Sequence, residues 1–116
     1  MNIRMEGLKI EHKLRQIYNY FGKASQLAKL VEESQELHEE CIKYEQNPSE
    51  DGFYAILDEL ADTLVVIMQI AFKKGFTLEY VYAYVLNQIR VKMNRTIDLI
   101  DLSKNNGTDY EEERYR

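Results

Sequence analysis

The chain has 116 residues, of which 45% are hydrophobic and 30% charged, a balance typical of one soluble globular domain and not of a disordered segment. Its net charge of −5 argues against a nucleic-acid polymer as the main partner. The longest apolar run, residues 64–70, falls short of the ~20 residues that a bilayer requires, and residues 1–11 lack the apolar stretch of a signal peptide. We therefore expect no membrane association and, with the single Cys41 unable to form an internal disulfide, a reducing cytoplasm.

With one proline and five glycines, the composition favours long helices over strands and turns. The first helix is expected over residues 2–21 and the second over residues 23–46, where apolar side chains recur at helical spacing. Residues 47–49 contain the proline and end the second helix. Either Ser49 or Asp51 is expected to cap the helix that follows.

The third predicted helix, residues 52–74, is apolar on nearly every side from Leu60 onward. A helix without a polar face is a buried helix. A chain of this length can hardly cover such a helix from all directions, so we expect a homodimer or homotetramer that covers it.

The fourth helix is expected over residues 78–102, with Lys92 and Arg95 on one edge of its apolar stripe. Residues 104–109 have a loop composition and introduce an acidic, aromatic end. We expect residues 1–103 to form a single all-α domain, a four-helix bundle completed by oligomerisation. Residues 104–116 are expected to be a mobile tail or an arm that packs on a neighbour.

Four acidic residues form two i,i+3 pairs on the second and third predicted helices: Glu33 with Glu36, and Glu59 with Asp62. Residues three apart share one face of a helix, so two such helices packed side by side bring four carboxylates to one point. Such a concentration of oxygen ligands indicates a site for a hard cation.

A solvated helix face is the alternative explanation for the acidic run at residues 32–40. However, like-charge i,i+4 pairs such as Glu32 with Glu36 are each unfavourable by about 0.2–0.5 kcal/mol. Asp62 lies within the apolar residues 56–72, where an ionised carboxylate is costly unless it is paired, hydrogen-bonded or bound to a metal. Taken together, the two pairs favour a metal site.

The ligand types indicate which metal the site would take. All-oxygen ligation suits Mg²⁺ or Mn²⁺ better than zinc. A di-iron bundle site would need Glu-x-x-His pairs, and neither His12 nor His38 lies three residues after an acidic residue. Mg²⁺ usually binds through carboxylates together with substrate phosphates, so the site predicts a phosphate-bearing ligand and nearby cations. Lys92 and Arg95 are the candidates, although an exposed basic edge would also explain them.

These acidic residues resemble the MazG-like members of the all-α nucleoside triphosphate pyrophosphohydrolase superfamily. The family motif E-E-x-x-E, followed after a spacer by E-x-x-D, corresponds to Glu32-Glu33-Ser34-Gln35-Glu36 and Glu59-Leu60-Ala61-Asp62. The resemblance extends over about residues 18–100 and includes two further segments, Tyr20-Phe21-Gly22 with Gln26-Leu27 before the acidic motif and Lys92-x-x-Arg95 after it.

The resemblance implies a MazG-like fold and Mg²⁺-dependent hydrolysis, with Mn²⁺ as the other candidate ion. The substrate would be a nucleoside or deoxynucleoside triphosphate, converted to the monophosphate and pyrophosphate as nucleotide-pool house-cleaning. By position the metal ligands would be Glu33, Glu36, Glu59 and Asp62, and Glu32 would hold a water or a second metal.

The resemblance also implies catalytic roles, but it does not identify the nucleobase of the substrate. Glu36 is the candidate general base, and Lys92 and Arg95 would hold the phosphates as negative charge accumulates. Some relatives carry a tryptophan near the base pocket, and this chain has none. Candidate substrate contacts are Tyr18, Tyr20, Phe21 and Gln26, although helix-spaced aromatic residues are commonly core residues.

Two other functions remain open at this point. The chain is alternatively a catalytically silent helical interaction module, or a sensor that binds a nucleotide without hydrolysing it. Both the enzyme and the silent module explain the helical stripes, but only the enzyme explains the Asp62 carboxylate inside an apolar helix.

Overall fold

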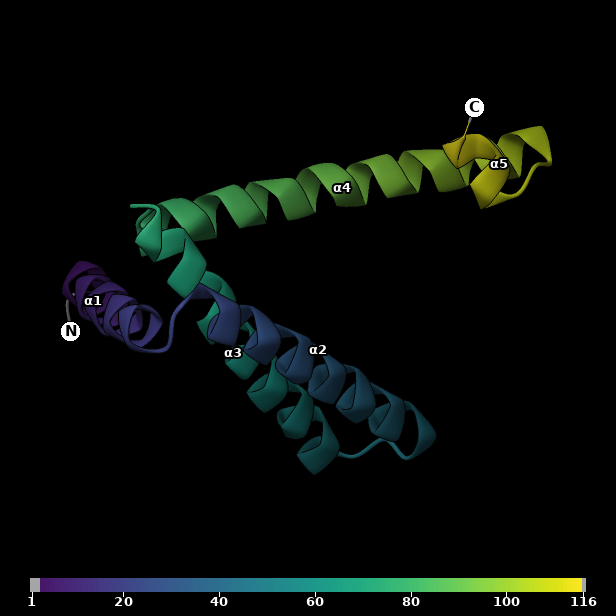
Figure 1. Ribbon diagram of the computed structural model, residues 1–116. Helices are drawn as coiled ribbons and strands as arrows, with labels where there is room; N and C mark the ends of the chain where they lie inside the picture. Colours follow the sequence, from purple (N-terminus) through teal and green to yellow (C-terminus); the bar gives the residue numbers. More distant parts are fainter. Residues whose placement is uncertain (1–2, 116) are drawn as a thin grey trace. The chain divides into compact units, whose positions relative to one another are not determined.

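The computed structural model describes residues 3–115, a range that contains helices and no strand. The helices follow one another along the chain as α1 (Ile3–Phe21), α2 (Lys23–Gln46), α3 (Glu50–Lys73), α4 (Leu78–Asn106) and α5 (Tyr110–Arg114) (Figure 1). The predicted all-α fold class is confirmed, and its completion by oligomerisation stays a prediction. The predicted start of the first helix at residue 2 and the last residue of the predicted tail, residue 116, lie outside the described residues.

The described chain divides into two compact units, residues 3–79 and residues 80–115. The first unit holds α1, α2, α3 and the first residues of α4, and the second holds the rest of α4 and α5. Each unit is described by itself below.

In the first unit, α2 and α3 form an antiparallel helical hairpin and lie side by side along their length (Figure 1). Ser49 caps α3 as one of the two predicted caps, since its side chain accepts a hydrogen bond of 2.9 Å from the backbone N–H of Gly52. At the other end of α3, Gly75 has a φ of +94°, the left-handed conformation that glycine adopts most readily at a helix C-terminus.

The core of the first unit follows one face of α3, against which α1 and α2 pack. Its buried residues, three apart along the helix, are Thr63, Val66, Gln69 and Phe72. Among the described residues the buried hydrophobic side chains are those of Val66 and Phe72, which are 2% and 1% exposed. The core of a single copy is therefore small.

The single chain does not cover α3 on all sides, as its length led us to expect, and the burial of the remaining surface in an oligomer stays a prediction. Five of its large apolar side chains are between 39% and 42% exposed: Leu57, Leu60, Leu64, Val65 and Ile67. Within the first unit, α1 and α2 cover one face of α3, so apolar surface of this unit remains open.

In the second unit, α4 continues to Asn106 and residues 110–114 form α5, so the predicted tail contains helix. Gly107, with a φ of +66°, allows the chain to turn between the two helices. Packing of the C-terminal segment on a neighbouring molecule stays a prediction. Within residues 3–115, none of the helices combines the length and the apolarity that a membrane span requires.

Candidate metal centre

The helical hairpin explains why the two acidic pairs meet. In an antiparallel hairpin, residues at similar distances in sequence from the turn lie level with each other, because both helices rise by the same amount per residue. Glu36 and Glu59 are about equally far from Pro48, and so are Glu33 and Asp62. Each acidic residue of α2 therefore has a partner on α3 at the same height.

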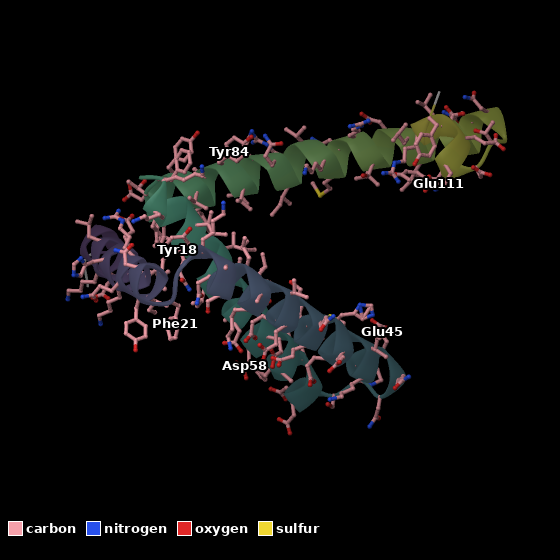
Figure 2. The ribbon with its side chains drawn as sticks, viewed as in Figure 1. Tyr18, Phe21, Glu45, Asp58, Tyr84 and Glu111 are labelled. Atoms are coloured by element: carbon pink, nitrogen blue, oxygen red, sulfur yellow. The ribbon has the colours of Figure 1, made fainter. Side chains whose placement is uncertain are left out.

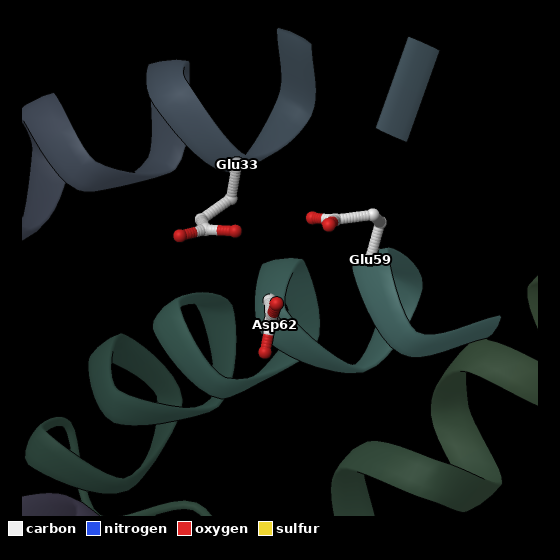
Figure 3. Close-up of side chains that lie close together, drawn as sticks. All are labelled: Glu33, Glu59 and Asp62. Carbon is white, nitrogen blue, oxygen red and sulfur yellow. The ribbon is translucent and has the colours of Figure 1, made fainter. Parts of the chain in front are cut away.

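Three of the carboxylates gather in the interior of this hairpin. One oxygen each of Glu33, Glu59 and Asp62 lies within 4.8 Å of the others. Figure 3 shows the Glu33 carboxylate directed from α2 toward α3, with the Glu59 carboxylate turned toward it and Asp62 beside them on the same helix. Glu33 is buried, Glu59 is half-buried and Asp62 is exposed, so the cluster opens to solvent on one side.

The hydrogen bonding of these carboxylates fits a site for a cation. Glu33 Oε2 and Glu59 Oε2 are both buried and have no hydrogen-bond partner among the described residues. Buried polar atoms are normally paired, and an unpaired one costs about 1–3 kcal/mol. A hard cation shared by these oxygens would satisfy both and remove the repulsion between the carboxylates.

The size of the cluster also suits Mg²⁺. Mg²⁺ binds oxygen ligands at about 2.0–2.1 Å, so two oxygen atoms on opposite sides of the ion are about 4.2 Å apart. The oxygens of Glu33, Glu59 and Asp62, which lie up to 4.8 Å apart, need only a small inward shift to reach that geometry. Side-chain rotation can supply this shift, because Asp62 is exposed and free to move.

Asp62 departs from the sequence prediction in one respect. The apolar residues around it led us to expect a buried carboxylate, but Asp62 is exposed in the single chain. Its apolar neighbours on α3 are themselves partly exposed, so they do not enclose it. Desolvation therefore does not explain the position of Asp62, and the closeness of Glu33 and Glu59 is the stronger observation.

Glu36, the fourth predicted ligand, lies beside this cluster. The negative charge of Glu33 raises the pKa of the Glu36 carboxyl above its usual value, and desolvation and the charge of Glu59 raise it further. The Glu36 carboxyl thus lies near the acidic groups of both helices, Glu33 on α2 and Glu59 on α3. Glu36 is therefore placed to hold or release a proton next to the three gathered carboxylates.

Lys29 is the cation nearest to this cluster in the first unit. Its Nζ lies 3.1 Å from Glu33 Oε1, one turn away along α2. The hydrogen bond to Glu33 and the charges of Glu32 and Glu33 raise the pKa of the Lys29 ammonium. The i,i+4 spacing of Lys29 and Glu33 was the signal that indicated this pair.

A pocket of about 570 Å³ lies next to the cluster, between α1, α2 and α3. Acidic and basic side chains form one part of its wall, and apolar and amide side chains form the rest. The lining residues are Ile17, Phe21, Ser25, Gln26, Ala28, Lys29, Glu32, Glu33, Asp62, Val65, Val66 and Gln69. The volume suits a small organic ligand.

The predicted substrate residues divide between this pocket and the surface. Phe21 and Gln26 line the pocket, and Gln26 is buried. Tyr18 belongs to α1, as Phe21 does (Figure 2), but it does not line the pocket. The centre of its ring lies 5.9 Å from Lys73 Nζ. Tyr20 is 83% exposed and contacts Phe21 edge-on, so it is not a pocket residue in the single chain.

The predicted phosphate-binding residues lie in the second unit. Lys92 and Arg95 line a separate pocket there together with Tyr110 and Arg114, two residues that the sequence analysis placed in a tail. Sequence patterns carried little signal for Tyr110 and Arg114, because five residues of helix are too few for a periodic pattern.

Comparison with known families gives a match that covers the whole helical hairpin. The profile of the MazG nucleotide pyrophosphohydrolase domain matches residues 21–96, which is more than half of the chain and includes both acidic pairs. The chain belongs to the MazG nucleotide pyrophosphohydrolase family. Comparison with curated proteins and with solved structures gives no significant match.

Membership of the MazG family agrees with the all-α fold and with the acidic hairpin. The matched residues span the hairpin, the pocket residue Gln26 and the basic residues Lys92 and Arg95. They stop before α5, so Tyr110 and Arg114 lie beyond the part of the chain that the MazG profile describes.

Proposed function

We propose that this chain is a Mg²⁺-dependent nucleoside triphosphate pyrophosphohydrolase that converts an NTP or dNTP to the monophosphate and pyrophosphate. The observation that carries the proposal is the gathering of Glu33, Glu59 and Asp62 oxygens within 4.8 Å, in a chain that belongs to the MazG family. Their unpaired oxygens and the adjoining pocket support a metal-bound, phosphate-bearing ligand.

Glu33, Glu59 and Asp62 would hold Mg²⁺ or Mn²⁺, with Glu36 beside them as a further ligand. When bound, such an ion neutralises charge on phosphate oxygens and lowers the pKa of a bound water. Glu32, which lines the pocket, would hold a water or a second ion.

Glu36 is the proposed general base. Its neighbours Glu33 and Glu59 raise the pKa of its carboxyl, which makes the ionised form a better proton acceptor than an ordinary glutamate. The proton of the attacking water would pass to Glu36.

The pocket beside the cluster is the proposed site for the nucleoside. Phe21 and Ile17 supply an apolar wall from α1, and Gln26 and Ser25 supply hydrogen-bonding groups from α2. Lys92 and Arg95 are proposed to hold the phosphates, because negative charge on the phosphate oxygens increases during phosphoryl transfer.

The decisive experiment measures pyrophosphate release from a panel of NTPs and dNTPs, with Mg²⁺ and with EDTA. Asp62→Asn is expected to lower the rate by about 10²-fold or more, because it removes one charge from the cluster. The matched control is Asp58→Asn, which makes the same change at an exposed position of α3 outside the cluster and is expected to keep the wild-type rate.

The alternatives have their own outcomes in this experiment. Tight, Mg²⁺-dependent nucleotide binding without pyrophosphate release would identify a sensor. Neither binding nor hydrolysis would identify a silent interaction module. Equal rates for the two variants would overturn the assignment of the metal site.

We also propose that the chain acts as a homodimer or homotetramer. None of the described residues of α4 is buried in the single chain, and large apolar side chains along it are about half exposed, including Leu86, Ile89 and Met93. An apolar surface of this extent usually marks an interface. Sedimentation analysis is expected to show a dimer or a tetramer, and a monomer at all concentrations would contradict the proposal.

A cytoplasmic location, in which the exposed Cys41 stays a thiol, remains a prediction.

A further inference from the structure

A second pocket, of about 380 Å³, lies within the second unit between α4 and α5. Its walls are built from one face of each helix. On α4 the lining residues Lys92, Arg95, Thr96 and Leu99 are spaced i, i+3, i+4 and i+7, and on α5 Tyr110 and Arg114 are spaced i and i+4. The basic edge of α4 is therefore faced by the inner side of the short C-terminal helix.

The fold-back of α5 onto α4 is held by a set of specific hydrogen bonds. Asp109 caps α5, with its side chain accepting from the backbone N–H of Glu112 at 2.8 Å. Glu113 is 6% exposed and accepts hydrogen bonds from Thr108 Oγ1 at 2.6 Å and from Asn106 Nδ2 at 3.2 Å. Thr108 N–H also donates to the Ser103 carbonyl of α4. These contacts fix the side of α5 that faces the pocket.

The pocket collects positive charge in a chain whose net charge is −5. Its lining contains three cations, Lys92, Arg95 and Arg114, and no carboxylate. Within the described residues, neither Lys92 nor Arg95 has an ion-pair partner. Unneutralised cations this close together repel one another unless an anion lies among them.

The contacts of Arg114 leave it available for such an anion. Its Nη1 lies 3.7 Å from Glu111 Oε2, and the two side chains are 52% and 62% exposed. Exposed ion pairs of this kind contribute little, so Glu111 is a weak competitor. The guanidinium carbon also lies 5.5 Å from the centre of the Tyr115 ring, a cation–π contact that does not neutralise the charge.

We propose that this pocket binds a phosphate-type anion and that α5 completes it, with Arg114 as the third cation and Tyr110 as part of the wall. A guanidinium can donate two parallel hydrogen bonds to phosphate oxygens, which an ammonium cannot do. Three cations match the charge of a pyrophosphate group better than that of a single phosphate. That this anion is the pyrophosphate part of the nucleotide, or the pyrophosphate released from it, rests on the proposed function.

The assignment adds residues beyond the match to the MazG family, which ends at residue 96. Lys92 and Arg95 lie within the matched part, whereas Tyr110 and Arg114 lie outside it. The C-terminal helix thus becomes part of a binding site in this chain.

The test is calorimetric titration of the full-length protein with sodium pyrophosphate in EDTA, so that no metal and no hydrolysis contribute. Arg114→Gln is expected to weaken pyrophosphate binding by about 10-fold, the loss of one charged hydrogen-bonding group. Arg114→Lys, which keeps the charge and loses the planar fork, is expected to fall between the wild type and Arg114→Gln.

The matched control is Arg90→Gln, which removes the same charge from α4 at a residue that is outside the pocket and donates to Asn87 Oδ1. It is expected to change pyrophosphate binding less than about 2-fold. Equal weakening by Arg114→Gln and Arg90→Gln would show a general charge effect and would overturn the pocket. Far-ultraviolet circular dichroism of Arg114→Gln checks that the helices remain folded.

The two proposals fail in distinguishable ways. If the wild type releases pyrophosphate from nucleotides but pyrophosphate binding does not depend on Arg114, the proposed anion site is contradicted and the proposed activity is supported. If pyrophosphate binding depends on Arg114 but no nucleotide is hydrolysed, the proposed anion site is supported and the proposed activity is contradicted. No binding of pyrophosphate or phosphate to the wild type would also overturn the pocket.

Discussion

Lys29 Nζ lies 3.1 Å from Glu33 Oε1, while the other oxygen of the same carboxylate, Oε2, is buried and has no partner within residues 3–115. One half of the Glu33 carboxylate is thus held by a cation of the protein, and the other half faces Glu59 and Asp62. Lys29 orients Glu33 and partly offsets the repulsion among the three carboxylates. At the proposed metal site, Lys29 would also compete with the ion for the same negative charge.

Replacing Lys29 by methionine is expected to separate these two effects. The metal-free variant should unfold at a lower temperature than the wild type, since the carboxylates lose their neighbouring cation. Mg²⁺ should then raise the unfolding temperature of the variant by more than that of the wild type. Thermal unfolding in EDTA and in millimolar MgCl₂ measures both shifts.

Lys23→Met provides the control, because it makes the same change at an exposed residue at the start of α2. It should leave the Mg²⁺-induced shift unchanged. A smaller Mg²⁺ effect in Lys29→Met than in the wild type would mean that Lys29 supports the metal site and does not compete with the ion.

The pH dependence of stability should reveal the crowding of the carboxylates. Glu33, desolvation and Glu59 raise the pKa of Glu36 above its usual 4.5 in the folded chain. Between the unfolded and folded pKa values the folded state binds more protons, so the free energy of unfolding decreases as pH rises through this range. Glu36→Gln should flatten this decrease in metal-free protein, as measured by urea unfolding in EDTA across the acidic to neutral range.

Mg²⁺ should act in the opposite direction, because it binds the deprotonated carboxylates. Its stabilising effect is expected to grow as pH rises toward neutrality. Glu39→Gln, on an exposed face of the same helix, should leave the wild-type pH profile in place. Parallel profiles for Glu36→Gln and the wild type would contradict the coupling between Glu36 and its neighbours.

The hairpin and its acidic pairs were predictable because their signals are local. Apolar periodicity and the Pro48 turn set the limits of α2 and α3, and Ser49 was recognisable as a cap. Two helices of similar length joined by a short turn leave little freedom in register, so the meeting of Glu33 with Asp62 follows from their spacing.

The features that escaped prediction depend on contacts between distant residues. The exposure of Asp62 is determined by what covers α3, which no local pattern specifies. The formation of α5 depends on Glu113 reaching back to Asn106 and Thr108, a tertiary contact in a segment of loop composition. The hydrogen bond between Glu11 and the backbone of Leu78 joins residues 67 positions apart.

Glu11 provides a test of how the first unit holds the start of α4. Its side chain is buried, and Glu11 Oε1 accepts a hydrogen bond of 2.6 Å from Leu78 N–H, the first backbone donor of α4. A carboxylate at this position accepts a hydrogen bond from this N–H group and interacts favourably with the positive end of the α4 dipole. Glu11→Ala is expected to lower the free energy of unfolding by about 1–3 kcal/mol in urea denaturation.

Glu11→Gln keeps an acceptor oxygen and should lose less stability than Glu11→Ala. In the control Glu6→Ala, the lost contact is a half-exposed pair with Lys9 at 3.7 Å, and the cost should stay below about 0.5 kcal/mol. Amide exchange at Leu78 should also accelerate in Glu11→Ala. Unchanged exchange there would show that the start of α4 is held by other contacts.

Substitution of Gln69 should affect the stability of the fold and the binding of a ligand in different ways. Gln69 is 1% exposed at the wall of the pocket beside the carboxylate cluster, and its Oε1 has no hydrogen-bond partner in the described part of the chain. A buried amide with an unpaired oxygen destabilises the fold, so Gln69→Met, which has similar volume, should leave stability unchanged or raise it by about 1 kcal/mol. If the pocket holds a nucleoside, the same substitution should raise the KM for the preferred nucleotide, because a polar group of the wall is lost. Gln16→Met, an exposed change on α1, should alter neither quantity. A clear loss of stability in Gln69→Met would show instead that the amide is paired in the folded protein.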